Sequence, residues 1–360
     1  MKLLRLKMKT INIIFLSVVV IYCSWLASMA SRDYNVDKGS NNQIKMPLTR
    51  LRESSGLVPI KTTEVDKRPL ITVSINRISN VMLIDTGAAN TSILPESASR
   101  SFLKKDVIQE DEMEKSEYKD LAGREAVNIG DEEYIADSLE IGQLIINTTP
   151  LIKQKNTNKK QLILNMGVDG IIGLNTIEEC GLMVDIKNKK MVLTWNGNLN
   201  KAEREALGFS PQSSYSPLKM KAKTTSKFTI PVLLKGTIEL PMIVDTGATR
   251  TYITESWYKK YFGKLPRLTT RTARSAWGKS QLRTFKTDLK IENMVFPNVE
   301  VGVIADAILP YDGVVGMDVL SQKRFLIDYP ARKMYFSGLS ETSLSSIDRR
   351  LESIVNASSR

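Results

Sequence analysis

Short apolar runs separated by turn residues dominate the chain from Pro69 onward. The first run is "PLITVSI", followed by a turn near Asn76 and then by "VMLIDTG". Two later runs, "KFTIPVLL" and "LPMIVDTG", are separated by Lys235 and Gly236. β-branched residues are frequent in all four runs, and none keeps the spacing of an amphipathic helix. The pattern predicts a mainly β fold, with short helices near 96–104 and 255–262.

The same pattern occurs twice, 160 residues apart. In "VMLIDTGAANTSIL" (81–94) and "PMIVDTGATRTYIT" (241–254), an apolar strand leads into Asp-Thr-Gly-Ala. A second matching pair, "VDGIIGLNTI" (168–177) and "YDGVVGMDVL" (311–320), follows further along each half. Matching spacing across two elements indicates one duplicated unit. We therefore expect an acid-protease fold of two homologous β-barrel-like lobes with the active site between them.

Polar segments between these patterns give the expected domain boundaries. Residues 197–226 contain "NKAEREALGF", which can form one or two helical turns, and the C-terminal tail can form a short helix around "SSIDRRLESIV". The predicted segments are a signal peptide or membrane anchor (1–30), a linker or prosegment (31–65), an N-terminal lobe (66–196), a linker (197–226), a C-terminal lobe (227–338) and a polar tail (339–360).

The N-terminal segment predicts export. Four basic residues precede 22 uncharged residues, Thr10 to Ser31. The dense apolar core has the length of a signal peptide, and Ser28-Met29-Ala30 fits a signal peptidase site. The whole uncharged span, residues 10–31, is also long enough to act as a membrane tether. Both interpretations export the rest of the chain, because the basic flank stays cytoplasmic. We expect a periplasmic, secreted or outward-facing tethered protein.

Composition excludes several classes of enzyme. The chain has no histidine, which removes serine and cysteine hydrolases that use a histidine base and zinc hydrolases with histidine ligands. Its two cysteines, Cys23 and Cys180, leave no disulfide within the exported domains and no cysteine-rich metal site. We expect no metal and no cofactor, and carboxylates are the leading candidates for catalysis.

Charge differs between the two halves. The net charge is +12, and removing Lys2, Arg5, Lys7 and Lys9 with the N-terminal segment lowers it to +8. Residues 66–195 carry 16 basic and 20 acidic side chains, whereas residues 218–340 carry 20 basic and 10 acidic ones. No nucleic-acid-binding motif accompanies the basic half, so nucleic acid is not an expected partner. A solvated face, or attraction between the lobes, explains the excess more simply.

Asp85 and Asp245 are the candidate catalytic residues. Each follows an apolar strand, and the small residues after it allow close approach of the backbone. If two such units face each other, the carboxylates cannot easily ionise together, and the pair shares one proton. One carboxylate can then take a proton from water while the other protonates a carbonyl oxygen. This chemistry hydrolyses a peptide bond without metal or histidine.

These motifs resemble those of the retropepsin-type aspartic proteases. The resemblance rests on Asp-Thr-Gly-Ala at 85–88 and 245–248, and on the apolar-apolar-Gly triplets at 171–173 and 314–316. It covers about 66–195 and 227–337, with both retropepsin-type units in tandem in one chain, as in pepsins. It implies a polypeptide substrate and a monomer with an internal pseudo-two-fold axis.

The resemblance also assigns roles to individual residues. Asp85 and Asp245 would be the catalytic pair, and Thr86 and Thr246 would lock the two loops together. The family closes a glycine-tipped hairpin flap over its substrate, for which the candidates are Leu121-Ala122-Gly123 and Ala276-Trp277-Gly278. The residues expected to bind substrate or support the site are Thr86, Gly87, Ala88, Thr246, Gly247, Ala248, Gly123, Trp277 and Gly278.

Two alternatives remain open. A peptide-binding module could keep the cleft without catalysis, although both Asp-Thr-Gly motifs are intact. A protease could also be active only as a homodimer of full chains, although the unequal intervening regions and opposite lobe charges favour pairing within one chain.

Since Ala88 and Ala248 lack the hydroxyl that pepsin-like enzymes usually place there, we expect raised apparent pKa values for the aspartate pair and an activity optimum of roughly pH 5–6.5.

Overall fold

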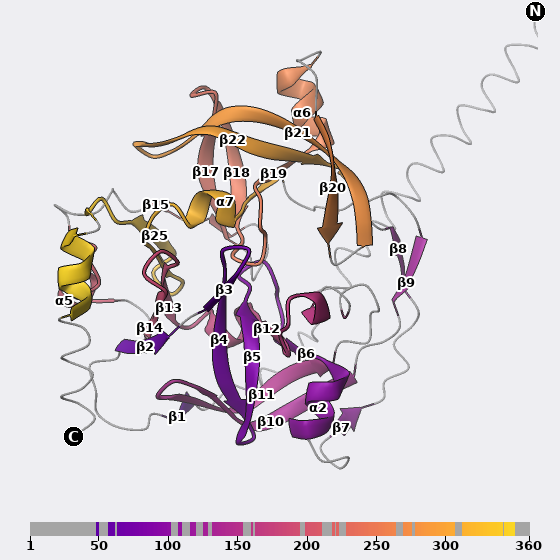
Figure 1. Ribbon diagram of the computed structural model, residues 1–360, viewed down its shortest axis with the longest axis vertical. Coiled ribbons are helices and arrows are strands. Elements are labelled where there is room, and N and C mark those ends of the chain that lie inside the picture. Colours follow the sequence, from indigo (N-terminus) through magenta and orange to yellow (C-terminus); the bar gives the residue numbers. More distant parts are fainter. Residues whose placement is uncertain are drawn as a thin grey trace, which may run out of the picture. The chain divides into compact units, whose positions relative to one another are not determined.

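The structure is a computed structural model (Figure 1), in which residues 46–360 form one compact unit. All of the following description concerns residues within that unit. The described residues are 48–49, 57–61, 63–101, 107–109, 116–119, 125–128, 132–153, 160, 163–194, 199–210, 218–219, 221–222, 228–263, 269–275, 278–306, 312–340 and 342–349.

Six strands of the first half close into a ring. Their order is β11, β6, β12, β5, β4 and β10, and β10 pairs back with β11. Three further strands, β1, β3 and β7, pair with members of this ring, and β8 and β9 form a separate hairpin. The bounds are β1 Leu48–Thr49, β3 Thr63–Val65, β4 Arg68–Ile75, β5 Ile78–Ile84, β6 Ser92–Ile93, β7 Val107–Gln109, β8 Ser116–Lys119, β9 Glu125–Asn128, β10 Glu132–Ile141, β11 Leu144–Lys153 and β12 Gly170–Ile172.

Six strands of the second half close in the same way. The order is β17, β18, β23, β19, β22 and β21, and β21 pairs back with β17. The predicted mainly β fold with two barrel-like lobes is therefore confirmed. The bounds are β16 Lys221–Ala222, β17 Phe228–Leu234, β18 Ile238–Val244, β19 Tyr252–Thr254, β20 Thr269–Ser275, β21 Gly278–Ile291, β22 Met294–Ile304 and β23 Gly313–Val315.

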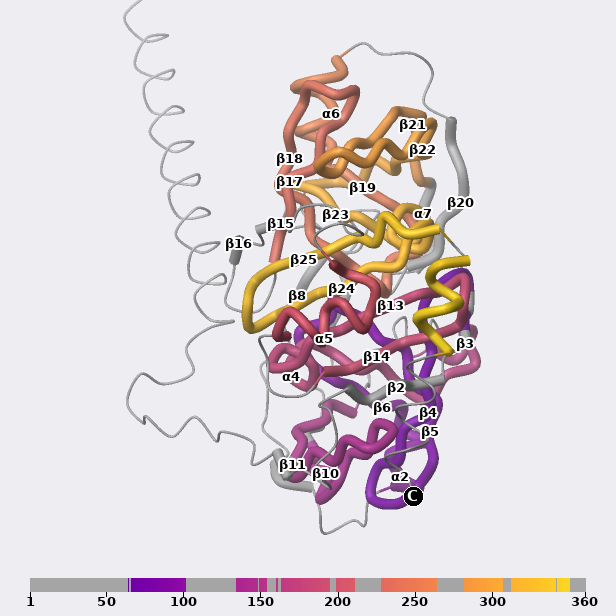
Figure 2. The backbone as a smooth tube through the Cα atoms, turned by 90° about the vertical axis from the view of Figure 1, so that its left-hand side faces the viewer, coloured from indigo at the N-terminus to yellow at the C-terminus, as the bar shows by residue number. Residues whose placement is uncertain are grey.

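A third sheet joins the halves. Its order is β15-β25-β24-β13-β14-β2, and its central pair takes β13 from the first half and β24 from the second. The pairing runs antiparallel from Gly181↔Asp328 to Val184↔Phe325, and the strands can be followed in Figure 2. The bounds are β2 Leu57–Lys61, β13 Gly181–Asp185, β14 Lys190–Thr194, β15 Leu218–Lys219, β24 Phe325–Asp328 and β25 Lys333–Phe336.

The helices are short. They are α2 Pro95–Ser101, α4 Leu174–Ile177, α5 Lys201–Ala206, α6 Glu255–Phe262 and α7 Met317–Leu320, with a further helical stretch over 342–349. The helix predicted over 255–262 is confirmed. The helix predicted near 96–104 begins one residue earlier, and the structure describes it only as far as Ser101. None of the helices in these described ranges is both long and apolar enough to span a bilayer.

Three segments predicted to lie outside the lobes are partly structured. The segment 31–65 was expected to be a linker or prosegment, but β2 pairs with β14 and β3 pairs with β4. The linker 197–226 supplies α5, as well as β15 and β16. In the tail, Leu344 and Asp348 are buried. The helical turns expected in the linker and the tail correspond to α5 and to the stretch 342–349. The short strands have no signal in their own sequence, because distant partners define them.

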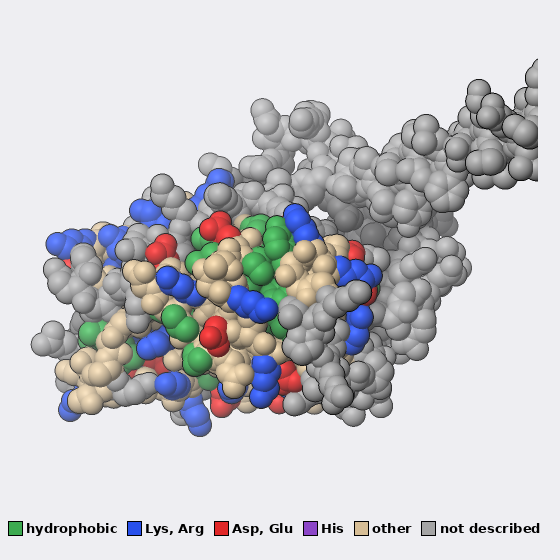
Figure 3. Space-filling model, turned by 90° about the horizontal axis from the view of Figure 1, so that it is seen from above, with side chains coloured by type: hydrophobic (Ala, Val, Ile, Leu, Met, Phe, Trp, Pro, Cys, Tyr) green, Lys and Arg blue, Asp and Glu red, His purple; other side chains and the backbone are tan. Residues whose placement is uncertain are grey.

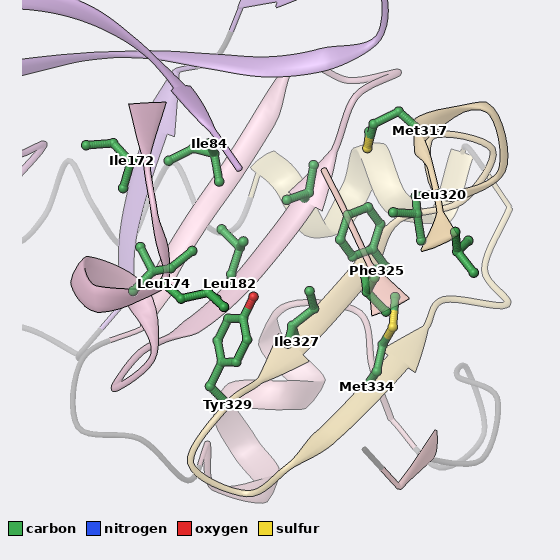
Figure 4. Close-up of a cluster of buried hydrophobic side chains, with 14 of the residues drawn as sticks. Ile84, Ile172, Leu174, Leu182, Met317, Leu320, Phe325, Ile327, Tyr329 and Met334 are labelled. Carbon is green, nitrogen blue, oxygen red and sulfur yellow. The ribbon is translucent and has the colours of Figure 1, made fainter. Parts of the chain in front are cut away.

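One hydrophobic cluster extends from both barrels into the shared sheet. Figure 4 shows part of this cluster. The first half contributes Ile84, Ile172, Leu174 and Leu182, and the second half contributes Phe325, Ile327 and Met334. All of these side chains are at most 1% exposed. Ile84 directly precedes Asp85, and Ile172 directly precedes Gly173. The core therefore supports the backbone from which the site projects.

Candidate active site

The two aspartates occupy equivalent positions. Asp85 follows β5, and its backbone N–H donates to the Ile172 carbonyl at 3.0 Å. Asp245 follows β18, and its N–H donates to the Val315 carbonyl at 3.1 Å. In each half, a short parallel strand, β12 or β23, lies beside the strand that carries the aspartate. The barrel therefore fixes the backbone at both residues.

Each carboxylate is held by its own loop. Asp85 Oδ1 accepts hydrogen bonds from the Gly87 N–H at 2.8 Å and the Ala88 N–H at 3.0 Å. Asp245 Oδ1 accepts the equivalent bonds at the same distances. These bonds orient one oxygen of each carboxyl group and leave Oδ2 outside the loop's own hydrogen bonds.

The two loops approach each other closely at their glycines. A Cβ atom at Gly87 would overlap the carboxylate of Asp245, and a Cβ atom at Gly247 would overlap that of Asp85. The two carboxyl groups are also hydrogen-bonded to each other. Glycine is therefore required at both positions by close approach, and the structure brings Asp85 and Asp245 together as a pair.

Reciprocal hydrogen bonds connect Thr86 and Thr246. The Thr86 N–H donates to Thr246 Oγ1 at 3.1 Å, and the Thr246 N–H donates to Thr86 Oγ1 at 3.0 Å. Each hydroxyl then donates to a carbonyl of the other half, Thr86 to Val244 at 2.8 Å and Thr246 to Ile84 at 2.7 Å. Both threonines are buried. Four bonds thus join the loops at their base.

The apolar-apolar-Gly segments lie directly against these loops. Leu174 N–H donates to the Ala88 carbonyl at 2.9 Å, and Met317 N–H donates to the Ala248 carbonyl at 2.8 Å. A Cβ atom at Gly173 would overlap the backbone of Asn90, and one at Gly316 would overlap that of Arg250. The glycines of both triplets therefore permit the packing that fixes Ala88 and Ala248.

Asp245 has a strongly altered acidity. Burial, followed by the charge of Asp85 and the hydrogen bond to it, raises the pKa of Asp245 to about 8. The two backbone N–H groups of Gly247 and Ala248 lower this pKa, but they do not offset the other effects. At neutral pH Asp245 therefore holds a proton.

The predicted flap residues are only partly described. Gly123 and Trp277 lie outside the described residues, as do Leu121, Ala122 and Ala276. Gly278 begins β21 and pairs with Ser275 at the end of β20. In the first half, β8 and β9 pair from Ser116↔Asn128 to Lys119↔Glu125. In the sequence, β8 and β9 flank 120–124, and β20 and β21 flank 276–277.

Two buried residues near the aspartate pair, Arg68 and Tyr329, lie outside the repeated motifs. Arg68 begins β4, and continuing the register from Leu70↔Leu83 places it opposite Asp85. Its guanidinium pairs with Asp66 at 3.2 Å and interacts electrostatically with Asp85. Tyr329 follows β24, is 4% exposed, and its hydroxyl interacts with Thr86. Hairpin register could have indicated Arg68, whereas no local signal indicates Tyr329.

Two other aspartates of the first half, Asp169 and Asp185, have structural partners. Asp169 accepts from the Val81 N–H at 2.8 Å, the Ser97 hydroxyl at 2.6 Å and Arg100 at 2.7 Å. Asp185 accepts from Arg324 at 2.8 Å. Within the described part of the chain, no three Cys, Asp or Glu residues are grouped so that they could hold a metal ion.

Comparison with known families gives one relevant result. A family model described as aspartyl protease matches residues 230–319. This range begins in β17, includes Asp245-Thr246-Gly247 and ends in α7. The match supports a protease, and hence a hydrolase of peptide bonds. A comparison with curated proteins gives no match.

Proposed function

We propose that this chain is an exported aspartic endopeptidase in which Asp85 and Asp245 share one proton and activate water. The proposal rests above all on the reciprocal approach of Gly87 to Asp245 and of Gly247 to Asp85. A carboxyl pair this close cannot ionise fully at neutral pH. The match of the second half to aspartyl proteases supports the same function.

The geometry suggests how the pair divides its work. Asp245, whose pKa is raised to about 8, holds the proton and donates it to the substrate carbonyl oxygen. The ionised partner, Asp85, takes a proton from water, and the water oxygen bonds to the carbonyl carbon. Collapse of this tetrahedral intermediate breaks the C–N bond as a proton passes to the leaving amine. The loop N–H bonds keep both carboxyl groups oriented throughout.

We further propose that the halves are two retropepsin-type units within one chain. Four hydrogen bonds between Thr86, Thr246 and their neighbours join the loops intramolecularly. This arrangement favours a monomer over a homodimer of full chains. We retain export, by a cleaved signal or a tether at 10–31, as part of the proposal, because the apolar N-terminal segment with its basic flank supports it.

Substitution of the pair tests the proposal. Asp85→Asn and Asp245→Asn should each reduce kcat for a peptide library substrate by at least about a thousandfold, since one carboxylate cannot perform both proton transfers. Asp137→Asn, at an exposed position of β10, is the matched control and should keep full activity. A mimic of the tetrahedral intermediate should bind the wild-type chain.

The alternatives give different results in the same experiments. A non-catalytic peptide binder would bind the mimic or substrate peptides without cleaving them. A homodimeric protease would show activity only in a species of twice the chain mass in sedimentation. Full activity of either Asp→Asn variant would disprove the role of the pair.

A further inference from the structure

A second surface of the C-terminal half combines lysines with exposed apolar side chains. We call it the lysine–aromatic face and define it by Lys235, Lys260, Lys286, Lys290, Tyr261 and Val295. It extends from α6 across the β17–β18 turn to the β21–β22 hairpin. Viewed from above Figure 1, where α6 lies, hydrophobic side chains gather beside Lys and Arg side chains (Figure 3).

Contacts connect the β17–β18 turn to both α6 and the β21–β22 hairpin. Lys235 Nζ lies 5.0 Å from the ring centre of Phe262 on α6. Lys235 also lines a hollow of about 540 Å³ together with Lys286, Lys290 and Val295. Within the β21–β22 hairpin, Lys290 is directly opposite Val295. Lys235 therefore contacts α6 on one side and lines the hollow beside the β21–β22 hairpin on the other.

The helix supplies an aromatic and cationic edge. Trp257 and Tyr261 are stacked with ring centres 4.7 Å apart. Lys260 Nζ lies 5.0 Å from the Trp257 ring centre and 4.9 Å from that of Tyr261. Tyr261 is 40% exposed and Val295 is 60% exposed. These are two of four large hydrophobic residues that are exposed among those the structure describes.

The positive charges of this face are largely uncompensated. Lys235, Lys260, Lys286 and Lys290 make no ion pair with any residue in the described ranges. Acidic side chains near this face have other partners. Asp288 lines the same hollow and accepts from the Asn298 N–H at 2.7 Å. Glu300 lies directly opposite Lys286 and pairs with Arg250, and Glu255 pairs with Lys259 and Arg283. Glu292 is exposed in the β21–β22 turn.

We propose that the lysine–aromatic face docks on an anionic phospholipid bilayer. Lysines attract acidic headgroups, and the hollow between Lys235, Lys286 and Lys290 is large enough to receive a phosphate group. Tyrosine and tryptophan favour the boundary between headgroups and acyl chains, where one end of the ring is apolar and the other polar. Val295 supplies an apolar contact without a polar group.

The chain's own N-terminus supports a bilayer as the occupant. The sequence predicts that residues 10–31 enter a membrane during export, with a basic flank on the other side. Stable attachment to a membrane generally needs two signals, such as an apolar anchor and a basic patch. The lysine–aromatic face provides a second signal, and it would hold the enzyme at the membrane even after cleavage of the first.

Vesicle binding tests this proposal without the N-terminal segment. Residues 46–360 form one compact unit that contains the hydrophobic core, so this region can be used. It should sediment with phosphatidylglycerol vesicles and remain in solution with phosphatidylcholine vesicles. Salt screens exposed charges, and 0.5 M salt shortens the screening length to roughly half of its value in 0.1 M salt. We therefore expect 0.5 M salt to release the protein from the vesicles.

Charge variants locate the interaction. Lys286→Glu with Lys290→Glu should raise the Kd for anionic vesicles by about 30-fold or more. Lys187→Glu with Lys201→Glu makes the same change in net charge at exposed positions elsewhere and should raise it less than about threefold. Tyr261→Ser should weaken binding several-fold, whereas Leu164→Ser, at a residue 44% exposed in the first half, should not. Unchanged unfolding midpoints would show that the variants are folded.

Several outcomes would overturn the proposal. Equal binding to neutral and anionic vesicles would remove the role of charge, and equal effects of the two lysine pairs would remove the role of this face. Inhibition of vesicle binding by millimolar inorganic phosphate would indicate a site for soluble anions. Binding to an acidic peptide or to a second copy, without binding to vesicles, would assign the face to a protein partner.

Discussion

Asp85 and Asp245 have the same loop hydrogen bonds but different surroundings. Both accept two N–H bonds on Oδ1 at matching distances. The buried Arg68 lies beside Asp85, at the position opposite it in the β4–β5 hairpin. The two carboxyl groups therefore differ in their charged neighbours, and burial together with Asp85 raises the pKa of Asp245.

The raised pKa of Asp245 predicts how stability depends on pH. Its ordinary value is 3.8 and its value in the folded chain is about 8, so between these values the folded chain holds a proton that the unfolded chain has released. This bound proton contributes to the free energy of unfolding. The contribution is fully present below pH 3.8 and is lost as the pH rises toward 8, with a slope of up to about 1.4 kcal/mol per pH unit.

Asp245→Asn should remove this slope, since the amide does not titrate. The measurement is urea unfolding at intervals between pH 5 and 8 for the wild type, Asp245→Asn and the exposed control Asp137→Asn. The control should keep the wild-type slope. Identical slopes for the wild type and Asp245→Asn would show that Asp245 is ionised throughout this range.

The alanine at position 88 leads to a prediction about the acid limb of the profile of activity against pH. Its N–H donates to Asp85 Oδ1 at 3.0 Å, but its methyl group donates nothing. A hydroxyl at this position can donate to the ionised carboxylate and favour the charged form. Ala88→Ser should therefore shift the acid limb of kcat/KM to lower pH. Ala89→Ser, at the exposed neighbouring position, is the control, and the same shift in both variants would contradict the prediction.

At the scale of elements, the hydrogen bonds between the two threonine loops carry a stability prediction. Thr246→Val removes the hydroxyl that accepts from the Thr86 N–H and donates to the Ile84 carbonyl. Two buried backbone groups are then left unsatisfied, which should lower the free energy of unfolding by about 3 kcal/mol. Thr72→Val on the exposed side of β4 should change it by less than about 0.5 kcal/mol. Urea unfolding of both variants checks the difference.

The elements also show what the sequence could predict. Both Asp-Thr-Gly strands, the helix over 255–262 and the two triplets that support the loops follow from local patterns, because each has several apolar or small residues in fixed order. β2 does not, because "LVPIK" has only five residues and its partner β14 is about 130 residues further along. Likewise, burial of Asp348 depends on Arg324, which its own segment does not reveal.

At the scale of the whole molecule, Arg324 joins its own segment to three others. It is 2% exposed, and its guanidinium donates to Asp185 at 2.8 Å, to both oxygens of Asp348 at 2.8 and 2.9 Å, and to the Leu207 carbonyl at 3.3 Å. These partners belong to β13, the helical stretch 342–349 and the end of α5. The buried network around Arg324 therefore includes Leu207 from the predicted linker and Asp348 from the predicted tail.

Arg324→Met should destabilise the chain strongly. It leaves Asp185 buried without its cation and leaves Asp348 only the longer pair with Lys190 at 3.4 Å. Loss of one partner in a buried ion pair costs about 3–5 kcal/mol. Arg349→Met, at an exposed position of the same helical stretch, should change the free energy of unfolding by less than about 0.5 kcal/mol. Chemical unfolding monitored by far-ultraviolet circular dichroism distinguishes them, and similar stabilities would refute a structural role for the network.

The place of β2 at one edge of the shared sheet sets a limit on N-terminal maturation. Five residues, Leu57 to Lys61, pair with β14, and they lie after the segment that a processing peptidase would remove. Trimming that stops before residue 48 keeps β1 and β2 paired in place. Trimming beyond Lys61 would strip β14 of its neighbour and expose an unpaired edge that favours aggregation. If the N-terminal segment is cleaved, the predicted linker or prosegment, 31–65, therefore contains the point at which cleavage has to stop.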